Sequence, residues 1–282
     1  MDIRGAVLLP ARREEIELHT IDELTLVGEL ALPLNREPVA TLVTLHPLPT
    51  AGGFMDSHIL RKSAARLPAL ADLAILRFNT RGTTSPRGTS EGAFDAGGAE
   101  AFDLAAAMDF VRERGLPRPW LVGWSFGTEV ALKYGRDHDI EGVILLSPPL
   151  HRTTPDEVAA WADGSRRVVV VVPEFDDYLR PDAAAERFAS VPDAVMIAVE
   201  GGRHLWVGET QTRRVLTEIV AAVNPDALPL PTEWDGPLGE GPQPVSALVL
   251  PGDDDLAVDD EDARGHRDRD ERAEEPEQRP SG

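Results

Sequence analysis

The sequence predicts an α/β protein with a mostly parallel sheet and helices on both faces of that sheet. The first observation is a series of short, continuously apolar segments, which is typical of strands buried on both faces. The second is that segments with apolar residues at helical spacing separate these strands. Strands that alternate with helices are joined by crossovers, and crossovers make neighbouring strands parallel.

Eight strands are expected. Residues 15–20 and 24–32 alternate between apolar and polar side chains, so they predict half-buried strands paired antiparallel at an edge of the sheet. Continuously apolar strands are expected at residues 39–45, 73–78, 120–124, 143–147, 168–172 and 194–199. Helices are expected at residues 57–70, 99–114, 126–136, 182–189 and 209–223. Such folds bind ligands beyond the carboxyl ends of their strands, so the functional residues are expected there.

Composition excludes several classes of function. The chain of 282 residues has no cysteine, which excludes disulfides, thiolate metal sites and a cysteine nucleophile. Its 28 basic and 49 acidic residues give a net charge of −21, which argues against nucleic acid or an anionic membrane surface as a partner. The sequence has no glycine motif for a nucleotide and no metal-ligand spacing, so we expect neither a cofactor nor a metal.

The N-terminal segment lacks the apolar core of a secretory signal, and no apolar run approaches the ~18 residues of a membrane-spanning helix. A soluble, cytoplasmic protein is therefore expected. The last 59 residues hold nine of the 24 prolines, and residues 253–282 carry 13 acids against five arginines. This predicts a folded domain at residues 1–224 and a largely disordered tail, Pro-rich and then acidic, at residues 225–282.

A serine lies at the end of the strand expected at residues 120–124. The sequence Gly123-Trp124-Ser125-Phe126-Gly127 is a G-x-S-x-G motif, and a helix follows it directly. This is the context of a nucleophile elbow, in which the glycines allow strand and helix to approach closely. The alternative is a Gly-Ser turn, or an anion-binding loop without chemistry. The strand–turn–helix frame favours Ser125 as a nucleophile.

A serine hydroxyl needs a general base, and in this kind of fold an acid and then a histidine follow the serine along the chain. His138 lies at the end of the helix that begins beside the serine, and no acid at a strand end precedes His151. His204 follows the strand at residues 194–199 in a glycine-rich loop. His204 is therefore the expected base.

The acid is expected in the loop after the preceding strand, which contains Glu174, Asp176 and Asp177. A carboxylate there would orient the imidazole and stabilise its protonated form. Asp176 is the expected acid and Asp177 remains the alternative. Glu174 is expected to be a solvated loop charge.

Two backbone N–H groups are expected to stabilise an oxyanion. One is the amide of Phe126, directly after the nucleophile. The other comes from the loop after residues 39–45, where Pro47 and Pro49 have no N–H and Leu48 does. His46 is expected to brace this loop by hydrogen bonds.

These residues, in this order, resemble the α/β-hydrolase superfamily, and more closely its small lidless bacterial hydrolases related to dienelactone hydrolases. The resemblance runs from about residue 39 to residue 223. It is carried by LHPLPTAGG (45–53), ILRFNTRG (75–82), GAFDAGGAEAFDLAAAMDF (92–110), LVGWSFG (121–127), PEFDDYLRP (173–181) and EGGRHLW (200–206). It implies an eight-stranded sheet with Ser125 as nucleophile, Asp176 as acid and His204 as base. Dienelactone hydrolases use a cysteine nucleophile, so their substrate is not implied for this chain.

Lid domains in this superfamily usually insert after the strand that follows the helix of the nucleophile elbow. In this chain that connection is residues 148–166, which leaves room for one short helix, so no cap domain is expected. The residues expected to bind substrate at the resulting open site are Phe54, Trp161, Tyr178 and Trp206. The sequence thus predicts a carboxylesterase-like serine hydrolase that cleaves a small ester, or less commonly a thioester or an amide, through an acyl-enzyme on Ser125. The alternatives are a non-catalytic binding or regulatory module on the same fold, and a cofactor-free perhydrolase or haloperoxidase.

Overall fold

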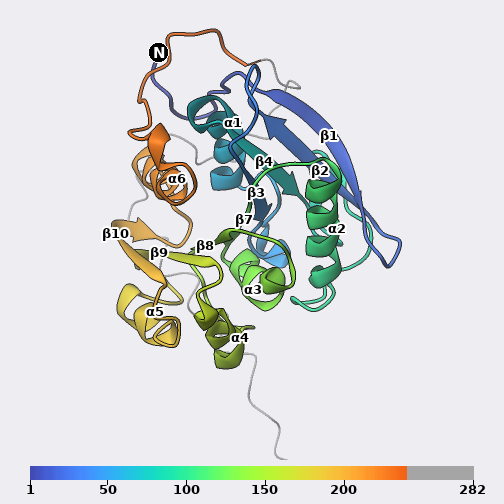
Figure 1. The fold of residues 1–282 in the computed structure, drawn as a ribbon, viewed down its shortest axis with the longest axis vertical. Helices are drawn as coiled ribbons and strands as arrows, with labels where there is room; N and C mark the ends of the chain where they lie inside the picture. Colours follow the sequence, from blue (N-terminus) through green and yellow to red (C-terminus); the bar gives the residue numbers. More distant parts are fainter. Residues whose placement is uncertain (240–282) are drawn as a thin grey trace, which may run out of the picture. The chain divides into compact units, whose positions relative to one another are not determined.

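The computed structural model describes residues 1–239, which contain an eight-stranded sheet (Figure 1). The strand order across this sheet is β1-β2-β4-β3-β7-β8-β9-β10. The strands are β1 Arg12–His19, β2 Thr25–Leu32, β3 Ala40–Leu45, β4 Leu73–Phe78, β7 Pro119–Trp124, β8 Gly142–Leu146, β9 Arg167–Phe175 and β10 Val195–Arg203. Strand β2 runs antiparallel to both β1 and β4, and every other neighbouring pair is parallel. The predicted eight-stranded, mostly parallel sheet is therefore confirmed.

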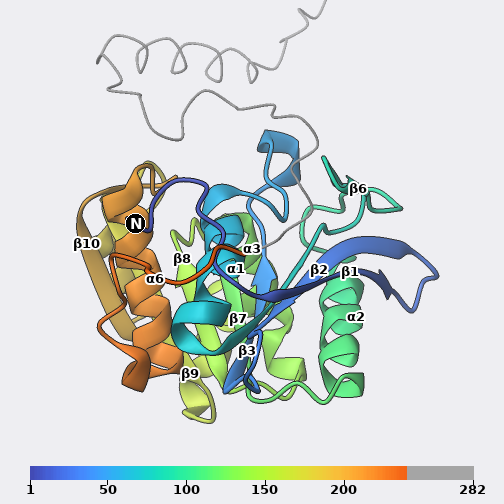
Figure 2. The same ribbon diagram turned by 90° about the horizontal axis from the view of Figure 1, so that it is seen from above.

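Helices cover both faces of the sheet (Figures 1 and 2). One face is covered by α1 His58–Ala71 and α6 Glu209–Val223. The other face is covered by α2 Glu100–Glu113, α3 Phe126–Tyr134, α4 Pro155–Ala159 and α5 Pro181–Arg187. Each helix turns its apolar stripe towards the sheet, which divides the core into two layers. The short elements are the hairpin β5 Thr84–Ser85 and β6 Gly88–Thr89, and the 3₁₀ turns η1 Pro49–Ala51, η2 Gly135–Asp137, η3 Ala160–Asp163 and η4 Pro225–Ala227.

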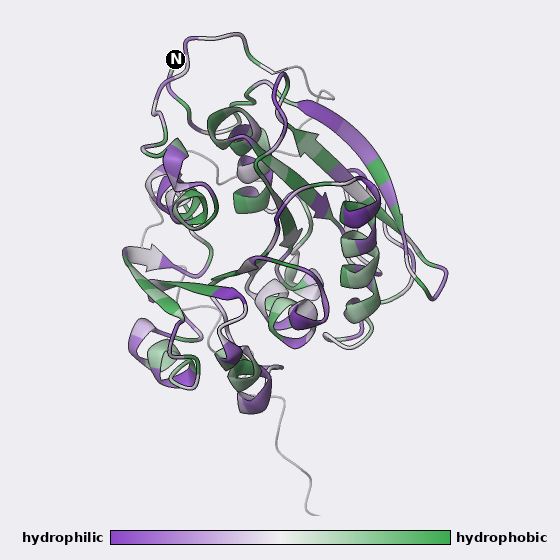
Figure 3. Ribbon diagram, viewed as in Figure 1, coloured by the Kyte–Doolittle hydropathy of each residue, from purple (hydrophilic) through white to green (hydrophobic). Residues whose placement is uncertain are grey.

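The central strands and the edge strand β1 differ in burial as their sequences predict, but β2 and β10 do not. Residues 28–32 of β2, expected to be half-buried, are all buried, because β2 lies between β1 and β4. In β10, expected to be buried on both faces, only Val199 and Gly202 are buried, because β10 is the last strand of the sheet. Every residue of β3 and β4 is buried, because their side chains are covered on both faces. In β1 only Leu18 is fully buried, and Figure 3 shows the hydrophilic colour along most of this strand. Charged side chains on such an edge strand oppose pairing with another chain.

At the opposite edge, β9 and β10 are longer than their apolar runs predict. The register of their parallel pairing shifts between Val199 and Arg203, so that Arg203 pairs with Phe175. Gly202 permits this irregularity, since a Cβ there would lie 2.9 Å from the Cβ of Pro173. The glycine-rich segment expected as a loop is therefore the last part of β10, and it carries the chain to residue 204 beside the loop that follows β9.

The segment that follows α6 packs against the N-terminal segment. Backbone hydrogen bonds join Ile3 N to Thr232 O and Gly239 N to Leu8 O, both at 2.9 Å. The ordered contacts thus continue past the expected end of the folded domain, because these backbone groups find partners near the start of the chain. The rest of the expected tail, residues 240–282, lies outside the described residues.

Candidate active site

Ser125 lies in the turn between β7 and α3, at the carboxyl end of a central strand. Its backbone has φ 52° and ψ −118°, a conformation that costs a non-glycine residue about 1–3 kcal/mol. The amide of Ser125 donates to Leu146 O at 2.9 Å, and its carbonyl oxygen accepts from the amide of Thr128 at 2.9 Å. The neighbouring strand and the following helix therefore hold this strained turn from both sides.

Both glycines of the motif are required by close approach of the backbone. A Cβ on Gly127 would lie 2.1 Å from Leu45 O, and a Cβ on Gly123 would lie 2.5 Å from Gly127 O. Neither position can carry a side chain unless the backbone moves. As a result, α3 packs directly on the end of β3, next to the loop that contains Leu48.

Ser125, His204 and Asp176 form a chain of hydrogen bonds. His204 Nε2 lies 2.8 Å from Ser125 Oγ, and His204 Nδ1 lies 2.9 Å from Asp176 Oδ2. The side chains of His204 and Asp176 are 8% and 1% exposed, so water weakens their contact little. In this arrangement a carboxylate holds the imidazole so that Nε2 can accept the serine proton.

Asp176 is held as an ionised acceptor. Its Oδ1 accepts the backbone N–H groups of Tyr178 at 2.8 Å and of Leu179 at 3.1 Å. Burial raises the pKa of this carboxyl, but His204 and the two backbone N–H groups outweigh burial, so the pKa lies below its ordinary value. Asp177 is exposed to solvent. Of the two aspartates that the sequence leaves open, Asp176 is the one in contact with His204.

Three groups hold the main chain around His204. Its carbonyl oxygen accepts from the indole Nε1 of Trp124 and from the hydroxyl of Ser147, both at 3.2 Å. Glu174, expected to be a solvated charge, instead accepts the N–H of Gly201 at 2.8 Å. Because Trp124 and Ser147 lie at the ends of β7 and β8, the sheet edge that carries Ser125 also positions His204.

The backbone amides of Phe126, the first residue of α3, and of Leu48, in the loop after β3, lie at this same edge. Strands β3 and β7 are hydrogen-bonded neighbours, with Leu45 opposite Gly123, so the loops that follow them are adjacent. Within residues 1–239, neither amide donates to another protein group. The N-terminus of α3 adds positive partial charge beside Phe126. The N–H groups of both amides are therefore available to donate to an oxyanion.

His46 orients the peptide group that carries the Leu48 amide. Its Nε2 accepts the backbone N–H of Thr80 at 3.0 Å, so Nδ1 carries the ring proton and donates to Pro47 O at 2.7 Å. The C=O of Pro47 and the N–H of Leu48 belong to one planar peptide group, so this bond sets the direction of that N–H. Burial lowers the pKa of His46 to about 4, which keeps the ring neutral at neutral pH. The expected bracing by His46 is confirmed.

The structure contradicts two of the expected substrate-binding residues. Trp161 is 2% exposed, and its Nε1 donates to Leu132 O at 2.9 Å within the core layer of α2 and α3. Trp206 is 0% exposed and packs in the core layer of α1 and α6. An aromatic residue near a strand end can fill a core position or a pocket wall, and local sequence does not determine which way the ring points.

Tyr178 does border the hydrogen-bonded chain. The residue is 57% exposed, and its ring packs edge-on against that of His204, with the ring centroids 4.6 Å apart. On its other side Tyr178 meets His151 at a centroid distance of 5.3 Å. Phe54 is half-buried in the loop before α1, and its role in substrate binding stays a prediction.

Two histidines near the site are absent from the expected set. His151, which the sequence argues against as the general base, packs against Tyr178, whose ring in turn contacts His204. His58, at the start of α1, packs edge-on against Trp124 and lies 2.6 Å through Nε2 from Leu205 O. No local pattern marks His58, because it lies 13 residues after the end of β3 and not directly after a strand.

The connection between β8 and β9 contains only α4 and η3, so the described residues hold no cap domain there. In residues 1–239, no group of three or more His, Asp or Glu side chains is arranged to hold a metal ion. None of the described helices is both long and apolar enough to cross a bilayer.

Solved structures of other proteins share this architecture. A lidless α/β serine hydrolase from Xanthomonas campestris has a TM-score of 0.64 at 24% identity, over 79% of this chain and 99% of that chain. The protein has the α/β-hydrolase fold. An α/β serine hydrolase homologue from Coxiella burnetii has a TM-score of 0.64 at 23% identity, over 74% of this chain and 97% of that chain. A Pyrococcus furiosus esterase has a TM-score of 0.56 at 16% identity, over 76% of this chain and 93% of that chain.

Similarity in sequence covers less of the chain than similarity in structure. No family model matches the chain. An uncharacterised protein of Rickettsia prowazekii is 30% identical over 117 residues, which is 40% of this chain and 46% of that protein. The chain therefore matches about half the length of this curated relative. The α/β-hydrolase fold is established by structure, and it confirms the fold that the resemblance implies.

The burial of Trp161 in this α/β-hydrolase fold leads to a stability prediction. Trp161→Ala should lower the free energy of unfolding by about 3–5 kcal/mol, because it leaves a cavity and an unpaired Leu132 carbonyl. Tyr178→Ala removes a more exposed aromatic ring and should cost much less. Urea unfolding of both variants measures the difference, and equal losses would contradict the core position of Trp161.

The buried neutral His46 predicts a dependence of stability on pH. Its pKa is about 4 in the folded state and near 6.5 in the unfolded state, so between these values the unfolded chain binds a proton that the folded protein does not. Stability is therefore unaffected by His46 above pH 6.5 and falls by about 3 kcal/mol as the pH drops to 4.

His46→Gln is the matched variant, because an amide can make similar hydrogen bonds without titrating. Urea unfolding at pH 7 and pH 4 should show a smaller acid loss for His46→Gln than for the wild type. Equal losses in the two proteins would show that His46 does not carry this dependence.

Proposed function

We propose that this protein is a serine hydrolase that cleaves a small ester through an acyl-enzyme on Ser125. The strongest support is the continuous hydrogen-bond chain from Asp176 through His204 to Ser125 Oγ. A serine hydroxyl is a weak nucleophile, and a base within hydrogen-bond distance typically contributes about 10²–10⁴-fold to the rate. The serine hydrolases and esterases among the similar structures are consistent with this reading.

In the proposed acylation, Ser125 Oγ attacks the ester carbonyl carbon while His204 Nε2 takes the hydroxyl proton. The carbonyl oxygen becomes an oxyanion, and the amides of Phe126 and Leu48 donate hydrogen bonds to it. When the intermediate collapses, the bond to the alkoxy group breaks and His204 returns the proton to the leaving oxygen. The alcohol departs and the acyl group remains on Ser125.

Deacylation repeats these steps with water as the nucleophile. His204 takes a proton from the water as its oxygen attacks the acyl carbon, and the same two amides stabilise the second oxyanion. Collapse returns the proton to Ser125 Oγ and releases the carboxylic acid. Asp176 does not take a proton in either half, because its lowered pKa keeps it ionised to stabilise the imidazolium.

The proposed substrate class is a small ester. Tyr178, exposed and packed against His204, is the side chain best placed to contact a bound ester, and Phe54 is proposed as a second contact. The same steps would also cleave a thioester, whereas an amide has a poorer leaving group and depends more on protonation by His204.

Ser125→Ala removes the proposed nucleophile. It should lower kcat for 4-nitrophenyl acetate by a factor on the order of 10⁶, as for other enzymes whose serine, histidine and aspartate act as a unit. The measurement is steady-state hydrolysis, together with mass-spectrometric mapping of a fluorophosphonate adduct, which should lie on Ser125 in the wild type.

Ser165→Ala is the control, since Ser165 is an exposed serine bonded to Asp163, and it should label and hydrolyse like the wild type. Full activity in Ser125→Ala, or no adduct on the folded wild type, would refute the proposal and favour a non-catalytic binding module.

Leu48→Pro tests the second oxyanion donor. Leu48 has φ −54°, within the range that a proline ring imposes, so the substitution removes the N–H with little change in the backbone. It should lower kcat by about 10²–10³-fold and change KM little. Leu48→Ala keeps the amide and should lose far less, so similar kinetics for the two variants would exclude this amide as a donor.

A further inference from the structure

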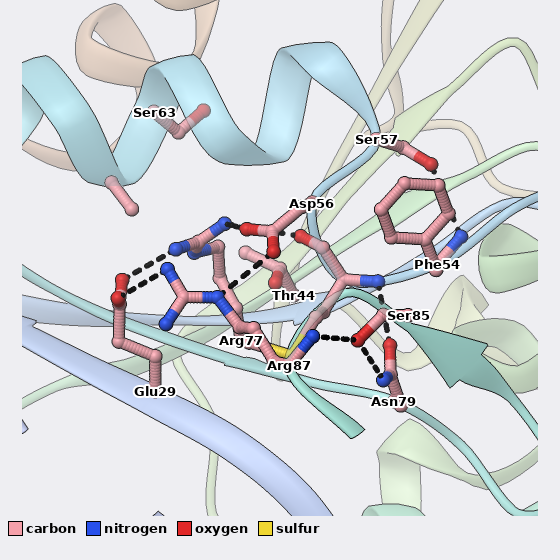
Figure 4. A network of polar contacts seen from close by, with 12 residues as sticks. Glu29, Thr44, Phe54, Asp56, Ser57, Ser63, Arg77, Asn79, Ser85 and Arg87 are labelled. Carbon is pink, nitrogen blue, oxygen red and sulfur yellow. Dashed lines mark hydrogen bonds and ion pairs between the residues drawn. The ribbon is translucent and has the colours of Figure 1, made fainter. Parts of the chain in front are cut away.

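A cluster of five charged side chains lies outside the hydrogen-bonded chain of Ser125, with Glu29 and Arg77 buried and the other three half-buried. Glu29 on β2 and Asp56 before α1 face Arg77 on β4, Arg87 between β5 and β6, and Arg13 on β1. Glu29 pairs with Arg77, with Arg87 at 2.7 Å and with Arg13 at 3.4 Å. Asp56 pairs with Arg77 and accepts from Arg87 Nε at 2.9 Å. Figure 4 shows Arg77 and Arg87 side by side between the two carboxylates.

The charges of this cluster are maintained despite burial. Burial raises the pKa of Glu29 and of Asp56, but the opposite effect of Arg77 and Arg87 is larger. Both pKa values therefore lie below their ordinary values, and both carboxyls stay ionised. Buried ion pairs are often no more stabilising than apolar side chains of similar volume. What distinguishes this cluster is therefore the segment that it holds in place.

That segment is the end of the loop between β3 and α1. The amide of Met55 donates to Asn79 Oδ1 at 2.9 Å, and the carbonyl oxygen of Met55 accepts from Arg77 Nη1 at 3.3 Å. The carboxylate of Asp56 is bound by Arg77 and Arg87. The backbone groups of Met55 are thus bonded to β4 and to Asn79 directly after it. The carboxylate of Asp56 is bonded to β4 and to the turn between β5 and β6 (Figure 4).

The backbone between Leu48 and this anchored segment forms a tight turn. The amide of Gly53 donates to Leu48 O at 2.9 Å, which closes the loop on itself. A Cβ on Gly53 would lie 2.2 Å from Pro47 O, so the two ends of the turn are in direct contact. The other end of the loop is held by His46 through Pro47 O.

We propose that Asp56 and Arg87 are positioning residues that keep the Leu48 amide aimed at the oxyanion. They act through the backbone between residues 48 and 56 and touch no reacting atom. This inference rests on the proposed function. An oxyanion hole works because its donors are held in place before charge develops, and a displacement of about 1 Å can cost roughly 10²-fold in rate.

Two matched variants separate positioning from stability. Arg87→Met and Arg13→Met each remove a guanidinium that pairs with Glu29, but of the two arginines Arg87 alone also binds Asp56. The readouts are the unfolding midpoint, kcat and KM for 4-nitrophenyl butyrate, and the Ki of a trifluoromethyl ketone, which binds serine hydrolases as an oxyanion adduct.

Both variants should lower the unfolding midpoint. Arg87→Met should also lower kcat by roughly 10- to 100-fold at nearly unchanged KM, and raise Ki by a similar factor. The reason is that a displaced Leu48 amide weakens the stabilisation of the oxyanion, which is present in the transition state and in the ketone adduct but not in the bound substrate. Arg13→Met should leave kcat and Ki within about twofold of the wild type, because it keeps the pairing of Arg87 with Asp56 that holds the loop. If Arg87→Met does not fold, Asp56→Asn, which keeps the side-chain size, replaces it with the same expected result.

Unchanged kcat and Ki in Arg87→Met, or equal losses in Arg13→Met, would overturn the positioning role while leaving the proposed function intact. A wild-type protein that neither hydrolyses the ester nor labels at Ser125 would overturn the proposed function, and the positioning role with it. The two failures are therefore distinguishable.

Discussion

The left-handed turn at Ser125 is the constraint on which the candidate site depends. A serine at φ 52° is strained, and the strain persists because the turn is hydrogen-bonded to β8 on one side and to the first turn of α3 on the other. Gly127 allows α3 to approach the end of β3, where any side chain would collide with Leu45 O. This approach places the Phe126 amide beside the loop of Leu48, so one packing contact sets the geometry of both the serine and the proposed oxyanion donors.

The remaining members of the hydrogen-bonded chain come from the far edge of the sheet. The register shift in β10 allows the strand to continue through its glycines, so that His204 emerges beside Asp176. Trp124 and Ser147 then tie the carbonyl of His204 back to the ends of β7 and β8. Residues at the ends of β7, β8, β9 and β10 are thus linked by hydrogen bonds. The positions of Ser125, His204 and Asp176 therefore depend on the sheet as a whole.

Polar groups that touch no reacting atom surround the loop after β3. His46 binds the peptide group of Leu48 at one end, and the pairing of Asp56 with Arg87 holds the other. The charged cluster draws its members from five segments of the chain, so no local pattern in the sequence announces it. In the proposed mechanism, this rigidity is what makes the Leu48 amide an effective donor, because reorganisation during the reaction would weaken it.

Local patterns in the sequence determined the order of strands and helices, because continuous apolar strands and helical stripes are properties of neighbouring residues. The contiguous glycine–serine motif likewise singled out Ser125. The sequence alone could not choose between Asp176 and Asp177, since the choice depends on which carboxylate the turn after β9 directs inward. Nor could it show that Trp161 and Trp206 fill the core, because the direction of a ring is decided by the elements that pack around it. Only the tertiary structure decided those directions, since they depend on contacts between segments far apart in the chain.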